Sequence, residues 1–165
     1  MAEAHRTNCT KIMKYTTTKK GYKKTNNKKI MQIKIGKPPY YDECVKAFGI
    51  DKRKGVVFTY GQDLWNPDNV EIPDHLFEHE LVHCAQQGGD NALASIWWRR
   101  YIDDSKFRVD QEIEAYKKQY QFICTKIKDR NARFRALHIL AVDMSSPMYG
   151  SSISYTDAIR RIRGN

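Results

Sequence analysis

The feature that most constrains this chain is the stretch His79-Glu80-Leu81-Val82-His83, because its side chains act together only on a helix. Residues four apart on an α-helix lie one above the other, so the two imidazoles project from the same face. Two such imidazoles can bind one Zn²⁺ through nitrogen atoms at about 2.0–2.1 Å. The carboxylate of Glu80 can then accept a proton from a water whose pKa the zinc lowers to about 7. The stretch predicts a metal-binding helix with a built-in base.

The flanking residues predict the bounds of this helix as about 73–87. Pro73 and Asp74 mark its start, with Asp74 as the N-cap, and Gly88-Gly89 mark its end. An apolar stripe is predicted to pack on the core and comprises Phe77, Leu81, Cys84, Ala85 and Gly88. His75 lies one turn before His79, but a straight helix cannot wrap three successive turns around one tetrahedral ion. We therefore expect His75 at the rim or the surface. The non-functional alternative is an amphipathic helix that carries histidines on its polar face.

A third ligand is needed, because a catalytic zinc has three protein ligands and one open position. The Gly and the His or Asp that some zinc proteases carry three and six residues after the second histidine are absent after His83. The next group of donors lies in a strongly helical stretch, 107–128. There, Glu112 and Ala115 share a helix face, and the small alanine would let this helix approach the metal helix closely. Glu112 is the predicted third ligand.

On these residues the sequence resembles the gluzincin branch of zinc metallopeptidases. In that branch, H-E-x-x-H is followed on a later helix by a glutamate ligand in an E-x-x-A setting, which His79–His83 and Glu112–Ala115 match. Members often carry Asp directly after this alanine, where it hydrogen-bonds a ligand histidine. Tyr116 stands there instead, and Glu114 or Glu78 are alternatives for that role.

A wider resemblance, to small zincin-like proteins of phages and prophages, covers residues 31–165. The segments that carry it are Val56–Gly61, Trp65–Pro67, His79–Gln87, Phe107–Arg108, Gln111–Glu112, Glu114–Tyr116 and Ser145–Gly150. This resemblance implies a metallopeptidase fold but gives no particular substrate. In zincins, a sheet edge beside the metal helix binds the peptide or protein substrate as an added strand, and the resemblance makes Gly55–Gly61 the candidate edge.

The order of the predicted elements indicates an α+β fold, a small N-terminal β-sheet packed on a helical body that carries the metal helix. Two strands are predicted at 31–35 and 55–60, and 62–69 is predicted to be a loop. Besides the metal helix and 107–128, helices are predicted at 41–48, 91–102, 130–144 and 156–163. Trp97 and Trp98 are interpreted as core packing.

The net charge of +10 is concentrated at one end of the chain. Residues 1–30 hold eight Lys and one Arg against one acid, which leaves only +2 for residues 31–165. The Thr- and Lys-rich composition predicts a disordered basic tail, ahead of one zincin-like domain at 31–165. The tail could contact nucleic acid weakly by electrostatics. Three alternatives remain for this segment. It could be a solvated leader, a stretch included because the start was assigned in error upstream of Met31, or a targeting leader.

Cysteine usage and hydropathy predict the compartment. Cys9, Cys44, Cys84 and Cys124 form no C-x-x-C pair and are predicted to be buried thiols in a reducing compartment. No apolar run reaches the 18 or more residues that a membrane span needs, and no secretory leader is evident. The expected localisation is cytoplasmic, or virion-associated if the chain is phage-encoded.

The predicted function is that of a zinc-dependent metallopeptidase, with His79, His83 and Glu112 as ligands of Zn²⁺ and Glu80 as base. An additional donor to the developing oxyanion is expected from a Tyr or His. Tyr149, in the 147–150 turn, and His138 are the candidates. Two other classes stay open: a catalytically inactive zinc-binding module of zincin fold, and a basic-tailed accessory protein associated with nucleic acid.

Overall fold

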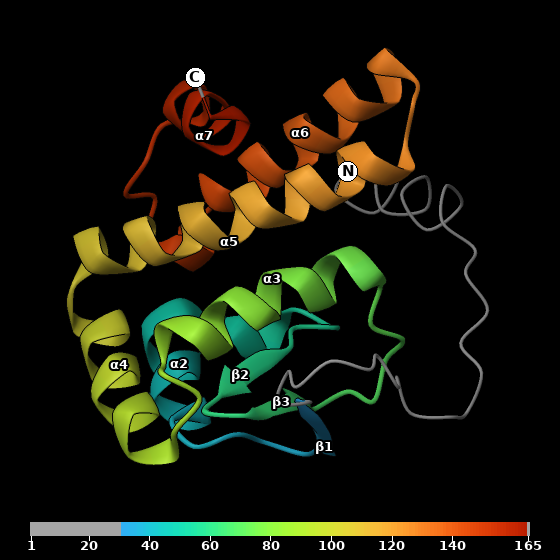
Figure 1. The fold of residues 1–165 in the computed structure, drawn as a ribbon. Helices are drawn as coiled ribbons and strands as arrows, with labels where there is room; N and C mark the ends of the chain where they lie inside the picture. The colour runs from blue at the N-terminus through green and yellow to red at the C-terminus, as the bar shows by residue number, and fades with distance from the viewer. Residues whose placement is uncertain (1–30, 165) are drawn as a thin grey trace.

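The computed structural model describes residues 31–164, which form an α+β fold with six α-helices and a three-stranded sheet (Figure 1). The predicted basic tail at residues 1–30, with Cys9, lies outside the described residues. The α+β class predicted from the order of elements is therefore confirmed for the described part of the chain.

The sheet is small and has the order β1-β3-β2. Strand β1 (Gln32–Ile35) pairs parallel to β3 (Asp63–Asn66), and β2 (Phe58–Tyr60) pairs antiparallel to it. The prediction of a loop over 62–69 is wrong for Asp63–Asn66, which form the central strand. A two-residue turn joins β2 to β3, and its Gly61 has a φ of 61°, which favours glycine.

The helices agree closely with the predicted ranges. They are α2 (Tyr41–Phe48), α3 (Asp74–Gln86), α4 (Asn91–Asp103), α5 (Ser105–Lys126), α6 (Arg130–Met144) and α7 (Tyr155–Arg163), with short 3-10 helices η1 (Ile50–Lys52) and η2 (Pro147–Tyr149). The predicted N-cap of α3 is wrong, because Pro73 holds that position and Asp74 is the first helical residue. In the first turn of α3, the negative charge of Asp74 still interacts favourably with the positive N-terminal end of the helix dipole.

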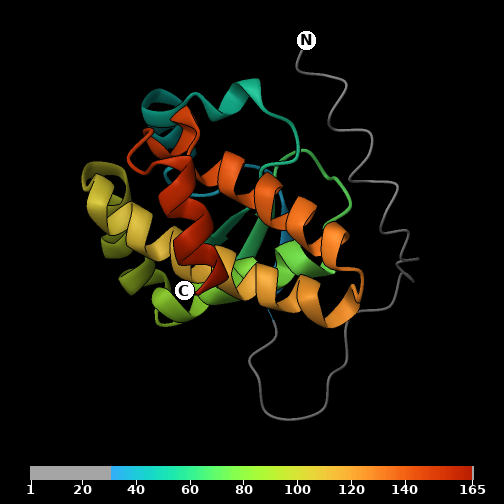
Figure 2. The same ribbon diagram turned by 90° about the horizontal axis from the view of Figure 1, so that it is seen from above.

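Helix α3 is the middle layer of the molecule, between the sheet and α5 (Figure 1). Seen from above, α7 crosses over α5 and α6 runs alongside it, and both pack on α5 (Figure 2). Leu76, Phe77 and Leu81 of α3 pack on a core formed by Met31, Val57 and Leu64. The opposite side of α3 therefore faces α5, and this is the side that carries the two histidines.

Two further apolar clusters support this arrangement. One joins α5, α6 and α7, and the other joins α2, β2 and α4. Trp97 and Trp98 belong to the second, as the packing interpretation predicts. Within residues 31–164, Cys44 is buried, whereas Cys84 and Cys124 are only half-buried, so the prediction of buried thiols holds for one of these three. No helix in this part of the chain is long and apolar enough to cross a membrane.

Candidate metal centre

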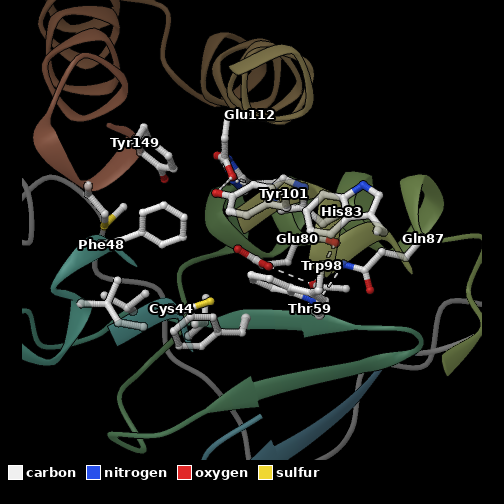
Figure 3. A pocket seen from close by; sticks show the side chains of 17 residues that line it. Cys44, Phe48, Thr59, Glu80, His83, Gln87, Trp98, Tyr101, Glu112 and Tyr149 are labelled. Atoms are coloured by element: carbon white, nitrogen blue, oxygen red, sulfur yellow. Dashed lines mark hydrogen bonds and ion pairs between the residues drawn. The ribbon is translucent and has the colours of Figure 1, made fainter. Parts of the chain in front are cut away.

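Three buried side chains converge between α3 and α5. His79 and His83 lie one turn apart on α3. Glu112 reaches toward His83 from α5 (Figure 3). The Nε2 atoms of the two imidazoles are 3.1 Å apart. Glu112 Oε2 lies 3.4 Å from Nε2 of His79, and Glu112 Oε1 lies 3.3 Å from Nε2 of His83. The three predicted ligands thus form one cluster that could hold a metal ion.

The spacing within this cluster can be compared with that of tetrahedral coordination. Bonds of about 2.0–2.1 Å in that geometry place neighbouring ligand atoms about 3.3–3.4 Å apart. Here the two imidazole nitrogens are 3.1 Å apart, and each lies 3.3–3.4 Å from a different oxygen of Glu112. With one ligand atom from each residue, the three atoms lie within 4.8 Å of one another. Glu112 Oε2 is buried and has no hydrogen-bond partner among the described residues. An unsatisfied buried oxygen is costly, and a cation held between the three side chains would satisfy it.

A glutamine on α5 orients His79. The Nδ1 atom of His79 lies 3.0 Å from Oε1 of Gln119, and Nε2 of Gln119 lies 2.8 Å from Nδ1 of His75. Because the amide nitrogen of Gln119 donates to His75, its oxygen accepts the Nδ1 proton of His79. The lone pair of Nε2 in His79 is then directed at the cluster. His75 stays outside the cluster, as predicted.

A second glutamine orients His83 in the same way. Oε1 of Gln86 lies 2.8 Å from Nδ1 of His83. Nε2 of Gln86 donates to the backbone oxygen of Gln111 at 3.1 Å and to Glu114 Oε2 at 2.9 Å. Two acceptors around this nitrogen fix the amide, so its oxygen must face the imidazole. In its neutral form, each histidine is therefore held in the tautomer that a metal ligand requires.

The amides of Gln119 and Gln86 are the hydrogen-bond partners of the two histidines, a role that the sequence left unassigned because Tyr116 stands in place of the usual Asp. Gln119 replaces the expected carboxylate as the partner of His79, seven residues after Glu112 on the same helix face. Glu114 contributes indirectly, because it holds Gln86. Glu78 instead lies 3.9 Å from a lysine of α5. The periodicity that groups Glu112 with Ala115 also includes Gln119 and could have identified it; Gln86 gives no comparable signal.

Tyr101 and the imidazoles keep the Glu112 carboxylate charged. The hydroxyl of Tyr101 donates to Glu112 Oε1 at 2.6 Å, and its ring stacks on Trp97 with centroids 4.8 Å apart. Burial alone would raise the pKa of Glu112, but the two imidazoles outweigh it and hold the pKa well below its usual range. Burial alone would lower the pKa of His83, but Glu112 outweighs it and raises the pKa to about 9. A metal ion must therefore displace a proton from this cluster.

Glu80 lies beside the cluster and is itself buried, with 4% of its surface exposed. Its Oε2 atom accepts a hydrogen bond from the hydroxyl of Thr59 on β2 at 2.8 Å. Burial raises the pKa of Glu80, although His83 and His79 oppose this shift. In Figure 3 its carboxylate points into the space between β2 and α5. The predicted base therefore has both a fixed position and an increased affinity for a proton.

The cluster forms one wall of a cavity of about 70 Å³. Glu80, His79, His83 and Glu112 line this wall, and Tyr149 lines another part of the cavity (Figure 3). The opposite wall is apolar, with side chains from α2, η1, β2 and η2.

Tyr149, the predicted oxyanion donor, belongs to a chain of hydrogen bonds. Its hydroxyl lies 3.0 Å from that of Tyr116, which donates to Asp143 Oδ2 at 2.5 Å. Asp143 is ion-paired with Arg53 at 3.1 Å and acts as the acceptor, so the Tyr149 proton is directed at Tyr116. A donor role for Tyr149 would require that proton to turn, and the role stays a prediction.

The other candidate donor is far from this site. His138 is exposed on α6, and its Nδ1 atom lies 2.7 Å from the hydroxyl of Tyr155 on α7. It does not line the cavity. The structure therefore places Tyr149 on the same cavity as the metal cluster and leaves His138 on the surface.

The expected substrate-binding edge of β2 is already occupied at one end. The carbonyl oxygen of Thr59 accepts hydrogen bonds from Trp98 Nε1 at 3.0 Å and from Gln87 Nε2 at 2.9 Å. The backbone N–H of Gly61 donates to Gln87 Oε1 at 2.7 Å. A peptide strand added at Thr59 would have to displace these side chains.

Comparison with known proteins assigns no family to this arrangement. No family model matches the chain, and searches of curated proteins and of solved structures found no match. The metal centre is therefore defined by its own geometry, two imidazoles and one carboxylate on two helices, with a fourth ionisable side chain beside them.

Proposed function

We propose that this protein is a zinc-dependent metallopeptidase of the zincin type. The observation that carries the proposal is the convergence of His79, His83 and Glu112, whose ligand atoms lie within 4.8 Å of one another, next to the buried carboxylate of Glu80. Two imidazoles and one carboxylate are a donor set typical of catalytic zinc, with the fourth position open to water or substrate. The layout of α3 and α5, joined by polar side chains and the small Ala115, fits the resemblance to gluzincins.

Zinc bound at this cluster would lower the pKa of a water molecule and polarise a carbonyl group. The residues of the chain supply the remaining chemistry. Thr59 holds Oε2 of Glu80, which leaves Oε1 to accept the proton of the attacking water. Burial favours the protonated form of Glu80 until the proton passes to the leaving amine. Gln119 and Gln86 keep the imidazoles in place throughout, and Tyr101 holds Glu112.

A zinc-content measurement with a peptide-cleavage assay tests the proposal. The purified chain should hold about one zinc ion, and His83→Ala should lose it. Glu80→Gln should keep the metal and lower the cleavage rate by a factor of about 10²–10⁴, as expected for a general base. Glu78→Gln is the matched control, because it makes the same change on the same helix outside the cluster and should leave both readouts unchanged.

Three outcomes separate the competing interpretations. Zinc binding without cleavage in the wild-type chain would indicate a metal-binding module that lacks turnover. Full activity in Glu80→Gln would reject Glu80 as the base. Absence of zinc from the wild-type chain, together with no loss on His83→Ala, would reject the metal centre itself.

A further inference from the structure

The wall opposite the metal cluster indicates which kind of chemical group the cavity could bind. It is formed by apolar side chains, among them Cys44, Ile50, Val57 and Phe58, all of which are buried. Among residues 31–164, no Lys, Arg or Asp lines the cavity, and the acidic residues that line it are Glu80 and Glu112, both on the metal side. A charged group placed against the apolar wall would be desolvated without a partner, which is strongly unfavourable. An uncharged, apolar group is the chemistry that this wall accepts.

The volume of the cavity sets the size of that group. At about 70 Å³, it has less than half the volume of an engineered apolar cavity of about 150 Å³ that binds benzene. An aromatic ring therefore does not fit unless side chains of the wall move. A branched aliphatic group of three or four carbon atoms is closer to the available space.

The burial of the lining residues indicates where the cavity opens to the surface. Of the residues that line it, only Phe48, Val56 and Met148 are half-buried, and the others are buried. These three come from α2, from the segment before β2 and from η2, so the cavity meets the surface between these elements. Met148 has the most flexible of the three side chains and can adapt to what passes it.

We propose that this cavity is a recognition pocket for a small, uncharged aliphatic group of the substrate, and that Met148 limits its size. The inference rests on the proposed hydrolytic function and names the substrate class of that site. It also accounts for the occupied edge at Thr59, since a ligand held by its side chain depends less on pairing with β2.

The test uses alkyl hydroxamates, which bind zinc through their polar end, added to the zinc-loaded full-length chain. Isobutyrohydroxamate should bind about tenfold more tightly than acetohydroxamate, because it buries two further carbon atoms at about 0.8 kcal/mol each. Phenylacetohydroxamate should bind more weakly than isobutyrohydroxamate. Titration calorimetry gives each affinity without any need for turnover.

Variants at the mouth sharpen the test. Met148→Ala should improve the binding of phenylacetohydroxamate and change that of acetohydroxamate little. Val142→Ala is the control, because it truncates a half-exposed residue that does not line the cavity. Val56→Ala serves the same purpose as Met148→Ala if the latter does not fold.

The outcomes distinguish this inference from the proposed function. Equal affinities across the series, or tighter binding of the phenyl compound by the wild-type chain, would overturn the pocket and leave hydrolysis intact. The expected ranking without any peptide cleavage would support the pocket and overturn the peptidase proposal. No binding of any hydroxamate to the zinc-loaded chain would overturn the pocket as well.

Discussion

The two faces of α5 are built on different principles. The face toward α6 and α7 carries Val109, Ile113 and Ile123, which belong to an apolar cluster. The face toward α3 carries Glu112 and Gln119, which are buried but have specific polar partners. Apolar packing depends on volume and tolerates substitution of similar shapes. Buried polar groups depend on each partner, so the loss of one leaves another unsatisfied. One face should therefore control stability and the other metal binding.

The largest effect on stability is expected from the apolar face. Ile113 is 7% exposed and lies within the cluster between α5, α6 and α7. Ile113→Ala should lower the free energy of unfolding by about 2–5 kcal/mol, through lost burial and the cavity left behind. Chemical denaturation measures this change, and zinc titration of the folded variant should give an affinity close to wild type. A large loss of zinc affinity in the folded protein would break the separation of the two faces.

The polar face should show the reverse pattern. Gln119→Ala removes the partner of His79 Nδ1 and should weaken zinc binding about 10–100-fold, the usual effect of losing such a partner. Gln121→Ala, on the exposed side of the same helix, is the matched control and should bind zinc normally. A competition titration with a coloured chelator measures both. Wild-type affinity in Gln119→Ala would mean that His79 needs no support from α5.

The number of protons released on zinc binding tests the electrostatics of the polar face. In the metal-free protein the pKa of His83 is about 9, so below pH 9 its imidazole carries a proton that zinc must displace. Zinc affinity should then rise up to about tenfold per pH unit as pH approaches 9 and level off above it. Calorimetry in buffers of different ionisation enthalpy counts the protons released near pH 7.5. A count of zero would show that this imidazole is neutral before metal arrives.

The smallest effect on the metal centre is expected from removing residues 1–30. These residues hold most of the net positive charge, and the proposal for them is weak electrostatic contact with nucleic acid. Their deletion should leave zinc content unchanged and lower retention on a DNA column, with a difference that disappears at high salt. Equal retention of the two chains at low salt would reject this contact.

Much of the site could be predicted, because its signals are local. The spacing of His79 and His83 fixes two ligands on one helix face, and the periodicity of 107–128 makes Glu112 a reasonable third. The role of Tyr101 has no short sequence pattern, since its contact with Glu112 joins α4 to α5. Gln86 lies three residues after His83 on α3, but the contacts with α5 that fix its amide leave no sequence pattern either. Gln119 did leave one, through its spacing from Glu112.

The fold shows the same division between local and long-range causes. A helix with clear apolar periodicity, such as α2, is predicted to the residue from its sequence. The central strand β3 was missed because Asp63 and Asn66 are typical of loops, and its strand conformation depends on pairing with β1 and β2 on either side. The predicted N-cap of α3, Asp74, is one residue too late. Pro73 and Asp74 both favour a helix start, and Pro73 holds the N-cap position.

The ligands of the metal centre come from two helices that are separated by α4 and lie about thirty residues apart in the chain. The unfolded chain does not hold them together, so zinc bound as proposed would bind the native state selectively. At free zinc a thousandfold above the dissociation constant, this preference adds about 4 kcal/mol to stability. Resistance to proteolysis would then follow the local supply of zinc, and starvation for the metal would shorten the lifetime of the protein.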